Sequence, residues 1–511
     1  MNNNPKLLEN NDNLAIKADE LKSKLDSNVP LLLFDLRDSN NFEKFHIPGS
    51  ACAVCNEETK RTVMPRLPKD MEIILVGEQQ NGEKEEKETY TKQMAEMMRQ
   101  IGLDAKYLEG GISSWKWQFN KSLDSDISPN DLKKLIDSEK DKKDLFLLDV
   151  REPEEFDQWH IDDSKNIPLG KLADQEILTK IPKDKKIVTI CPHGNRSTIG
   201  KYILERYGYN VSSLEGGLKA WSFSFEIASS EYNVDNTSKM RLFQFRRIGK
   251  GCMSYLLDSD GQAAIIDPVY PIKEYLDKSI EIGTKIIKII DTHQHADHVS
   301  AAKSLAKETG AQYIQSSYEN YLDDDASNTN QVKDGDVISI GRVKLKAIHT
   351  PGHTQGSISF LVDNRVDTLY NSDKFAGILF TGDTLFVNGV GRPDLRDKAK
   401  EFSGNLYDTL QQRLMILPNN TLIFPSHFDK DVTIDEMLYS TLGNIKEKSV
   451  FLNPQITREQ FIQKLSDKIM TTPPNYLQII AINKGEKPNA SKPSSDIFEL
   501  EMGPNRCSIS S

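Results

Sequence analysis

Several apolar segments in the second half of the chain end in residues that can bind a metal. The clearest is residues 286–290. The loop after this segment places three histidines and one aspartate within six positions, in the order His293, Gln294, His295, Ala296, Asp297, His298. A short apolar run before a polar loop predicts a buried strand, and layered α/β folds build ligand sites on the loops that leave their strands. The chain is therefore expected to contain a layered α/β domain with a metal-binding loop.

Three further metal-ligand candidates follow at the same kind of position. His353, Asp383 and His427 each come shortly after another strand-like apolar run. The four motifs, in this order and context, resemble the metallo-β-lactamase superfamily over roughly residues 240–460. The resemblance implies an αββα domain whose metal centre lies at the strand ends.

The candidate ligands leave two metal centres open. Seven residues belong to the set, namely His293, His295, Asp297, His298, His353, Asp383 and His427. The complete set can hold two zinc ions, as in the glyoxalase II thioester hydrolases. A subset of His293, His353 and Asp383 would supply two imidazoles and one carboxylate, which suits a non-haem Fe(II) oxygenase with open positions for O₂ and substrate. The ligand set alone does not separate these alternatives.

Other segments favour iron. The G-x-G-R-P-D-L sequence at residues 389–395, and the tail segments 475–480 and 503–507, resemble the persulfide dioxygenase branch of the superfamily. That resemblance implies one Fe(II) per chain and oxidation of a thiol persulfide by O₂ to sulfite and the free thiol. It assigns Arg392 either to substrate positioning or to bracing of the loop. It also places four residues in an unused second metal site or around the ligands, where they would orient them: His295, Asp297, His298 and His427.

The first 230 residues contain one sequence unit twice. Residues 34–37 (Phe-Asp-Leu-Arg) recur as 148–151 (Leu-Asp-Val-Arg), and the Leu-Glu-Gly-Gly sequence at 108–111 recurs at 214–217. Strand-like and helix-like segments alternate in both copies, which predicts a parallel sheet with helices on both faces. The motifs resemble the rhodanese (sulfurtransferase) domain, with predicted bounds of 1–120 and 123–228.

Only the second copy has a candidate nucleophile. Cys191 follows the strand-like residues 186–190 and begins the loop Cys-Pro-His-Gly-Asn-Arg-Ser. Loop N–H groups directed at the sulfur and the start of the next helix both favour the reactive thiolate. Arg196 in this loop can bind an anionic sulfur substrate. The rhodanese resemblance implies that Cys191 carries a persulfide, and the direction of sulfur transfer stays open.

The first copy lacks this loop. Gly77 stands at the position of Cys191, and residues 78–88 are rich in glutamate and lysine. An acidic loop without a thiol would repel anionic sulfur donors. We therefore predict that residues 1–120 form an inactive rhodanese-like domain with a structural or docking role.

Composition and charge limit the partners and the compartment. A chain of 511 residues is expected to form several domains, and its net charge of −11 argues against nucleic acid. No apolar run approaches the roughly 20 residues of a membrane span. Five cysteines do not make a disulfide framework, which indicates a reducing cytoplasm. The expected partners are a low-molecular-weight thiol persulfide (of glutathione or coenzyme A), O₂ and sulfite or thiosulfate, in a chain that is compatible with a homo-oligomer.

The boundaries of the metal domain come from local patterns. Residues 228–239 are polar and predict a linker, and residues 243–245 predict the first strand of the domain. Residues 252–257 and 261–268 predict a β-hairpin, in which Cys252 is expected to be structural. The predicted domain covers residues 240–460, and residues 461–511 form its C-terminal extension.

Overall fold

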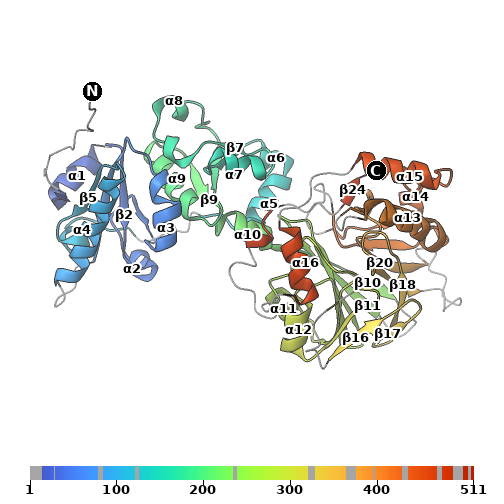
Figure 1. Cartoon of the computed structure of the whole chain (residues 1–511). Helices are drawn as coiled ribbons and strands as arrows, with labels where there is room; N and C mark the ends of the chain where they lie inside the picture. The colour runs from blue at the N-terminus through green and yellow to red at the C-terminus, as the bar shows by residue number, and fades with distance from the viewer. Residues whose placement is uncertain are drawn as a thin grey trace. The chain divides into compact units, whose positions relative to one another are not determined.

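The computed structural model divides the chain into two compact units, Met1–Ala220 and Trp221–Ser511 (Figure 1). It describes residues 14–27, 29–53, 55–78, 84–120, 126–233, 239–319, 321, 328–363, 376–394, 398–428, 436–468, 475–486, 499–503 and 508–510. Within these ranges, no helix is both long enough and apolar enough to cross a membrane.

The first unit contains the predicted repeat as two parallel sheets. The first sheet has the strand order β1-β5-β4-β2-β3, and the second has the order β7-β6-β8-β9. All pairings within both sheets are parallel. The strands of the two sheets are β1 (Ala15–Ile16), β2 (Leu31–Asp35), β3 (Ser50–Cys52), β4 (Glu72–Val76), β5 (Ala105–Leu108), β6 (Leu145–Asp149), β7 (Lys165–Asn166), β8 (Lys186–Ile190) and β9 (Val211–Ser213).

Helices cover both faces of the first sheet. In β2, Leu32 and Phe34 pack in one apolar cluster, and Leu31 and Leu33 pack in another. A strand that is buried on both faces reads as a continuous apolar run, as this one does. The two predicted α/β domains are therefore confirmed. The helices of this part of the chain are α1 (Ala18–Asp26), α2 (Ser39–Lys44), α3 (Glu57–Thr62), α4 (Lys84–Gln100), α5 (Pro129–Asp137), α6 (Glu139–Lys142), α7 (Pro153–Gln158), α8 (Gln175–Leu178), α9 (Asn195–Arg206) and α10 (Gly217–Phe223).

The repeated Asp-x-Arg motif has the same structure in both copies. Arg37 donates from Nε and Nη2 to the Asp35 carboxylate, and Arg151 does the same to Asp149. Each arginine also donates to a backbone carbonyl eight residues further along the chain. All four side chains are buried. Because a bidentate pair of this kind fixes both partners, the motif holds the strand end to the segment that follows it.

The second unit is built mainly from two mixed sheets, each with both parallel and antiparallel pairings. The first has the order β10-β11-β12-β13-β14-β15-β16, and the second has the order β17-β18-β19-β20-β22-β23. The strands are β10 (Phe225–Asn233), β11 (Lys239–Arg247), β12 (Met253–Ser259), β13 (Gln262–Ile266), β14 (Lys285–Ile290), β15 (Gln312–Ser316), β16 (Thr329–Val332), β17 (Val337–Ile340), β18 (Val343–His349), β19 (Ile358–Asp363), β20 (Gly377–Gly382), β22 (Leu422–Pro425) and β23 (Ser440–Thr441).

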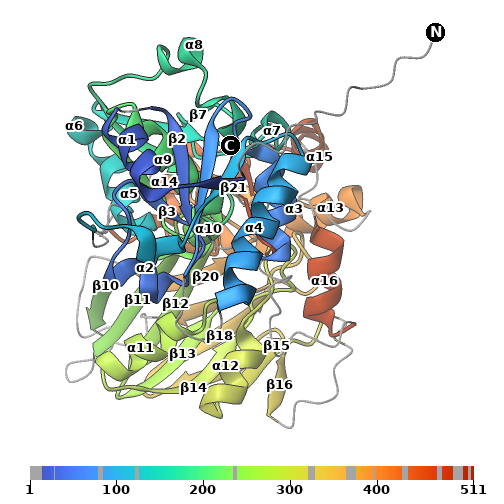
Figure 2. The same cartoon turned by 90° about the vertical axis from the view of Figure 1, so that its left-hand side faces the viewer.

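The layers of this unit follow from three apolar clusters. One lies between the sheets and includes Tyr255 of β12 and Phe360 of β19. A second packs α11 (Lys273–Glu281) and α12 (Ala302–Thr309) on the outer face of the first sheet, as Figure 2 shows. A third packs α13 (Ala399–Thr409), α14 (Leu442–Lys448) and α15 (Arg458–Asp467) on the outer face of the second sheet. The predicted αββα arrangement is confirmed.

The predicted linker at residues 228–239 is wrong. Residues 225–233 form β10, which pairs with β11 along its full length in antiparallel register, from Phe225 opposite Arg247 to Asn233 opposite Lys239. The polar side chains that suggested a linker belong to an edge strand with one solvated face. The predicted hairpin of β12 and β13 is confirmed, with Ser259 opposite Gln262 at its turn.

The C-terminal residues pack on the second unit. The strand β24 (Ser508–Ser510) pairs with β21 (Gly389–Gly391), so that the tail lies beside the loop that follows β20. The helix α16 (Tyr476–Lys484) also belongs to this unit. Of the tail segment 503–507, residues 504–507 lie outside the described residues.

Candidate functional site

Four strands of the second unit end at the predicted ligand positions. The strands β14, β18, β20 and β22 confirm the four apolar runs, and the loops after them contain His293, His353, Asp383 and His427. All four side chains are buried. The two sheets thus bring residues that are up to 134 positions apart to one end of the domain (427 minus 293).

His293, His353 and Asp383 form a compact group. The Nε2 atoms of His293 and His353 lie 3.7 and 3.5 Å from Oδ2 of Asp383. One donor atom from each of the three residues lies within 4.8 Å of the other two. The structure thus brings two imidazoles and one carboxylate together with converging donor atoms.

The surroundings of this group fit a metal ion. The Nδ1 atom of His293 is 2.9 Å from the Thr292 hydroxyl oxygen, and Nδ1 of His353 is 2.8 Å from the Arg392 carbonyl oxygen. These contacts fix each ring with Nε2 directed at Asp383. Nε2 of His293 and Oδ2 of Asp383 are buried and have no hydrogen-bond partner among the described residues. Burial, followed by the neighbouring His295 and His353 rings, holds the pKa of His293 well below its ordinary value, so the ring is neutral and can donate its lone pair.

His295 lies beside His293, with ring centroids 4.2 Å apart, and forms a second group of three with His293 and Asp267. Asp267 is a residue that the sequence patterns did not single out as a ligand. The Nε2 atom of His295 is 3.3 Å from Oδ1 of Asp267. Asp267 also accepts hydrogen bonds from the backbone N–H and the hydroxyl of Thr292, at 2.7 and 2.8 Å. Asp267 thus fixes Thr292, the residue before His293 in the metal-binding loop. The one sequence signal for this role was the position of Asp267 directly after β13.

Gly382 allows the two sheets to approach at the site. Its φ of 53° lies in the left-handed region, and a Cβ atom built there would come within 2.4 Å of the Thr292 hydroxyl oxygen. A larger residue would therefore meet both a conformational penalty and a clash. This glycine sets the distance between Asp383, which follows it, and the loop that contains His293.

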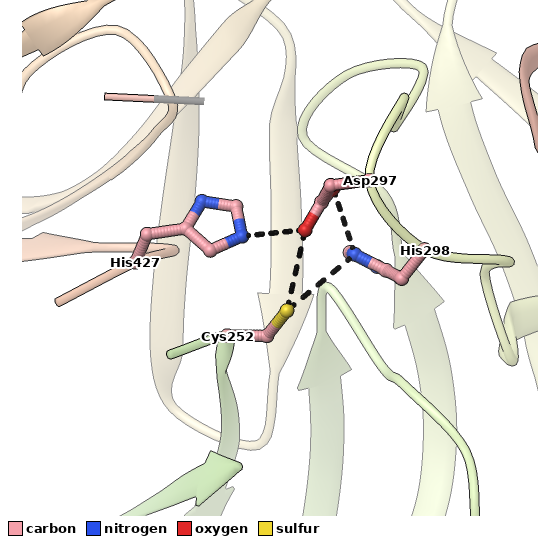
Figure 3. Close-up of side chains that lie close together, drawn as sticks. All are labelled: Cys252, Asp297, His298 and His427. Carbon is pink, nitrogen blue, oxygen red and sulfur yellow. Dashed lines mark hydrogen bonds and ion pairs between the residues drawn. The ribbon is translucent and has the colours of Figure 1, made fainter. Parts of the chain in front are cut away.

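Asp297, His298 and His427 form a second group, and Cys252 joins it (Figure 3). We call these four residues the Cys252 cluster. The Asp297 carboxylate lies 3.0 Å from Nδ1 of His298, 2.9 Å from Nε2 of His427 and 3.3 Å from the Cys252 sulfur. Nδ1 of His427 lies 2.6 Å from Oδ1 of Asp383, which connects this cluster to the first group.

The charges in the Cys252 cluster compensate one another. Burial acts to raise the pKa of Asp297, but the charged His298 and His427 rings outweigh burial and hold it well below its ordinary value. Burial acts to lower the pKa of His298, but the Asp297 carboxylate raises it to about 10. Buried ionised groups are stable only when they are paired in this way.

Arg392 is buried and does not reach solvent. Its guanidinium donates from Nε and Nη2 to the Asp394 carboxylate, at 2.8 and 2.6 Å. Its carbonyl oxygen is the partner of His353 Nδ1. Of the two predicted roles, this geometry favours bracing of the loop.

The helix α16 and Glu501, both in the C-terminal part of the chain, also fix the metal-binding loop. Asn483 donates from Nδ2 to the carbonyl oxygens of His295 and His298, at 2.9 and 2.8 Å, and accepts from the backbone N–H of Ser300 at 3.0 Å. Glu501 accepts from the backbone N–H of Val299 at 2.8 Å. These contacts span 183 to 202 positions of sequence, and sequence patterns alone did not reveal them.

Replacing Asn483 with alanine is expected to loosen this loop. Two buried carbonyl groups and one N–H lose their partner, which costs about 1–3 kcal/mol of stability. Because residues that orient metal ligands typically change metal affinity about 10- to 100-fold, we expect metal affinity to fall by that factor in a competition assay with a chelator. Asn444→Ala, at an exposed position of α14, is the matched control and should leave the affinity unchanged. Equal affinities for the two variants would contradict the role of Asn483.

Cys191 occupies the predicted strand-end loop in the first unit. Its sulfur accepts a hydrogen bond from the Gly194 backbone N–H at 3.2 Å and lies 3.3 Å from the Ser197 hydroxyl oxygen. The helix α9 begins at Asn195, directly after the left-handed Gly194. A short loop that ends in a helix start thus surrounds the sulfur, as the sequence predicted.

The Leu-Glu-Gly-Gly motif supports this loop from behind. A Cβ atom at Gly217 would come within 2.3 Å of the Cys191 carbonyl oxygen, so only glycine fits there. The next residue, Leu218, donates from its backbone N–H to the same carbonyl at 2.8 Å. In the first copy, Ile112 donates to the carbonyl of Gly77 at 2.8 Å, so the motif has the same role in both copies.

Arg196 pairs with a carboxylate. It donates from both terminal nitrogens to Glu155, at 2.7 and 2.6 Å, and only 6% of the residue is exposed. Burial acts to lower the pKa of Arg196, but Glu155 outweighs burial and raises it. The Arg196 guanidinium therefore lies at the loop, and the Glu155 carboxylate neutralises part of its charge.

Gly77 in the first copy has no room for a nucleophile. It follows β4 as Cys191 follows β8, and a Cβ atom there would come within 2.4 Å of the Thr91 hydroxyl oxygen on α4. The remainder of the acidic loop, from residue 79 to 83, lies outside the described residues. At the position that aligns with Cys191, the Thr91 side chain of α4 thus fills the space that a side chain would need.

Comparison with known proteins agrees with these two folds. A family model described as "Rhodanese-like domain" matches residues 17–118 and 128–224, and one described as "Metallo-beta-lactamase superfamily" matches residues 247–427. The chain is 28% identical over 235 residues to "Persulfide dioxygenase ETHE1, mitochondrial" of Bos taurus, which covers 45% of this chain and 81% of that protein. It is 31% identical over 191 residues to a hydroxyacylglutathione hydrolase of Maricaulis maris, with coverage of 37% and 67%.

A solved structure is similar as well. The crystal structure of ETHE1 from Myxococcus xanthus is 28% identical, with a TM-score of 0.40, and covers 47% of this chain and 96% of that chain. Together, the two family models match both copies of the repeat and the loops that contain His293 and His427. Persulfide dioxygenases are among the relatives of this chain. The chain therefore belongs to the metallo-β-lactamase superfamily, and two rhodanese-like domains precede its metallo-β-lactamase domain.

Proposed function

We propose that this chain is a bifunctional enzyme of sulfur metabolism. Its metallo-β-lactamase domain oxidises a thiol persulfide with O₂, in the reaction R-S-SH + O₂ + H₂O → R-SH + SO₃²⁻ + 2H⁺. Its second rhodanese-like domain transfers sulfane sulfur through Cys191. The first rhodanese-like domain has a structural or docking role. We place the protein in the cytoplasm, because the four described cysteines are free thiols.

The observation that carries this proposal is the convergence of His293, His353 and Asp383. Their donor atoms meet within 4.8 Å in a buried group of two imidazoles and one carboxylate. A set of this kind suits one Fe(II) per chain, which would supply open coordination positions and electrons for O₂ chemistry. The persulfide dioxygenases among the relatives and the presence of a sulfurtransferase in the same chain support iron over zinc.

The residues around this group would orient the ligands and exclude water. The Arg392 carbonyl holds His353 in the tautomer with its proton on Nδ1, and the Asp394 carboxylate holds the Arg392 side chain. His427 holds Oδ1 of Asp383, which leaves Oδ2 directed at the two imidazoles. We therefore assign Arg392 to the bracing of the site, and His427 to the orientation of its carboxylate.

The sulfurtransferase step would take place in the Cys191 loop. The Cys191 thiolate attacks the outer sulfur of R-S-SH, the S–S bond of the substrate breaks, and the thiol leaves as R-S⁻. The Gly194 N–H stabilises the negative charge on the loop sulfur. Sulfite then takes the outer sulfur of Cys191-S-SH and leaves as thiosulfate. The reverse direction would supply persulfide from thiosulfate.

A dizinc thioester hydrolase is the second candidate function. It rests on the hydroxyacylglutathione hydrolases among the relatives and on the complete set of seven ligand residues. This alternative requires two zinc ions per chain and hydrolysis of an acylated thiol without O₂. Metal content therefore separates the two candidates.

The test is metal content and O₂ uptake of the full-length protein after anaerobic purification, with glutathione persulfide as substrate. We expect about one iron per chain, O₂ consumption and release of sulfite. Asp383→Ala should lose the iron and the O₂ uptake, because it removes the only carboxylate of the group. Two zinc ions per chain with thioester hydrolysis and no O₂ uptake would favour the hydrolase instead. Iron without O₂ uptake would call for coenzyme A persulfide as the next substrate.

A further inference from the structure

A cavity of about 540 Å³ lies in the first unit, between the two copies of the repeat. The first copy lines it with the C-terminal half of α1, residues 48–49 before β3 and residues 115–118, and the second copy lines it with the C-terminal half of α9. Its volume is within the range of about 300–1,000 Å³ that is usual for small-molecule sites. The Cys191 loop leads into the opposite end of α9, so this cavity is a feature separate from the nucleophile.

One wall of the cavity is aromatic and comes from Trp115 and Trp117. The two indole rings pack edge to face, with centroids 4.8 Å apart, and Nε1 of Trp115 donates to the Gln118 carbonyl at 3.1 Å. Trp115 is buried in the core of the first copy, whereas Trp117 is half-buried. The inner indole therefore fixes the outer one, whose partly exposed ring offers a flat surface to a ligand.

The second copy adds a half-buried cation to the cavity, Arg206. Its Nη2 atom donates to the Gly49 carbonyl of the first copy at 3.2 Å. Within the part of the chain that the structure describes, Arg206 forms no ion pair. Burial lowers the pKa of Arg206, as expected for a cation without a compensating carboxylate. Because a desolvated charge without a counter-charge is unfavourable, an anionic ligand would stabilise this guanidinium.

The other charged groups of the lining leave this preference for an anion in place. Lys22 pairs with Asp26 on α1, and its Nζ atom lies 5.9 Å from the centroid of the Trp117 ring. Burial raises the pKa of Glu205 on α9, which means that the charged form of this carboxyl is disfavoured here. Arg206 is therefore the charge in the lining that most needs a partner.

We propose that this cavity binds a purine nucleotide, with the base against Trp117 and the phosphate on Arg206. A base that stacks on an indole gains affinity without a specific hydrogen-bond pattern, and a fused two-ring base covers more of the indole than a one-ring base. The planar guanidinium matches two phosphate oxygens at once. The nucleotide can be free or can be the adenylate part of a carrier such as coenzyme A, because both share this chemistry. The site gives the first copy a role that requires no nucleophile, and it does not rest on the proposed oxidation or sulfur transfer.

The test is calorimetric titration of the full-length protein with AMP at low ionic strength. We expect about one AMP per chain, and quenching of tryptophan fluorescence as the base stacks on Trp117. Arg206→Ala should weaken binding by about tenfold or more, because it removes charged donors to the phosphate. Trp117→Ala should weaken it by a similar factor through the loss of stacking. Arg61→Ala is the matched control, because Arg61 is an exposed arginine of α3 in the same unit and should leave the affinity unchanged.

Further ligands separate the parts and the sources of the nucleotide. Adenosine and inorganic phosphate should each bind at least about tenfold more weakly than AMP, since each keeps only part of the contacts. Coenzyme A that binds more tightly than AMP identifies the carrier as the ligand, and equal or weaker binding identifies the free nucleotide. Glu205→Gln should keep or strengthen the binding of AMP, because it removes a negative charge from the lining.

Four results would overturn the proposal. Two concern the ligands: no binding of AMP or coenzyme A at millimolar concentration, and adenosine that binds as tightly as AMP. Two concern the variants: affinity that is unchanged in both Arg206→Ala and Trp117→Ala, and weaker binding of AMP by Glu205→Gln. Circular dichroism shows whether each variant is folded, and Arg206→Gln replaces Arg206→Ala, with the same expected loss, if the latter does not fold. Binding is measured without turnover, so the proposed enzyme activities can fail without affecting this result.

Discussion

Replacing Cys191 with serine is expected to abolish sulfur transfer from glutathione persulfide to sulfite, by on the order of a thousandfold or more. A serine hydroxyl fits the same space and accepts the Gly194 N–H, so the loop should keep its structure. It cannot form the persulfide that carries the sulfur between the two substrates. The first rhodanese-like copy offers no replacement at the aligned position, because Gly77 stands there against Thr91. The measurement is the rate of thiosulfate formation by the full-length chain.

Cys52→Ser is the matched control for this experiment. Burial, followed by the nearby Asp35 carboxylate, raises the pKa of Cys52 to about 11, so its thiol stays protonated at neutral pH and is a poor nucleophile. Sulfur transfer should be unchanged in Cys52→Ser, and O₂ uptake should be unchanged in both variants. Sulfur transfer at the wild-type rate in Cys191→Ser would contradict both the role of Cys191 and the inactivity of the first copy.

Much of the fold followed from local sequence patterns. The two parallel sheets of the first unit were predictable because their core strands are continuous apolar runs within a repeated motif. The hairpin of β12 and β13 was predictable from two apolar runs around a glycine. The strand β10 was missed, because its exposed positions alternate with buried ones and give it the composition of a linker. Pairing with β11, not composition, determines its structure.

The candidate site was predictable in its ligand types but not in its grouping. Histidines and aspartates at four strand ends were visible in the sequence, and the structure brings His293, His353 and Asp383 together. The place of Cys252 beside His427 depends on a β-bridge between residues 175 positions apart (427 minus 252), which no local pattern reveals. The same limit applies to Asn483, whose contacts with the metal-binding loop form only after the C-terminal helix has packed.

Replacing Glu501 with glutamine is expected to destabilise the second unit by roughly 3–5 kcal/mol. Glu501 accepts from Nη1 of Arg247 at 2.6 Å and from the Val299 backbone N–H at 2.8 Å, and both side chains of the ion pair are fully buried. Glutamine leaves the guanidinium charge in a dry environment without its carboxylate, and this desolvation cost is the main loss. The measurement is the unfolding transition of the second unit in scanning calorimetry of the full-length chain, where the temperature of that transition should fall.

A double variant separates the charge from the shape at this position. Replacing Arg247 with methionine and Glu501 with leucine removes both charges, and a buried ion pair replaced by apolar residues is often close to neutral in stability. The double variant should therefore recover much of the stability that Glu501→Gln loses. The Val299 N–H still lacks its acceptor in the double variant, which costs about 1–3 kcal/mol.

Asp408→Asn is the matched control, because its 3.3 Å ion pair with Arg458 is nearly half exposed and such pairs contribute about 1 kcal/mol or less. If Glu501→Gln were no more destabilising than this control, the tail would not belong to the cooperative unit that holds the metal-binding loop. Because Val299 directly follows His298, a tail that does belong to this unit ties the stability of the domain to the geometry of its ligands. Loss of metal affinity and loss of stability should then occur together in Glu501→Gln.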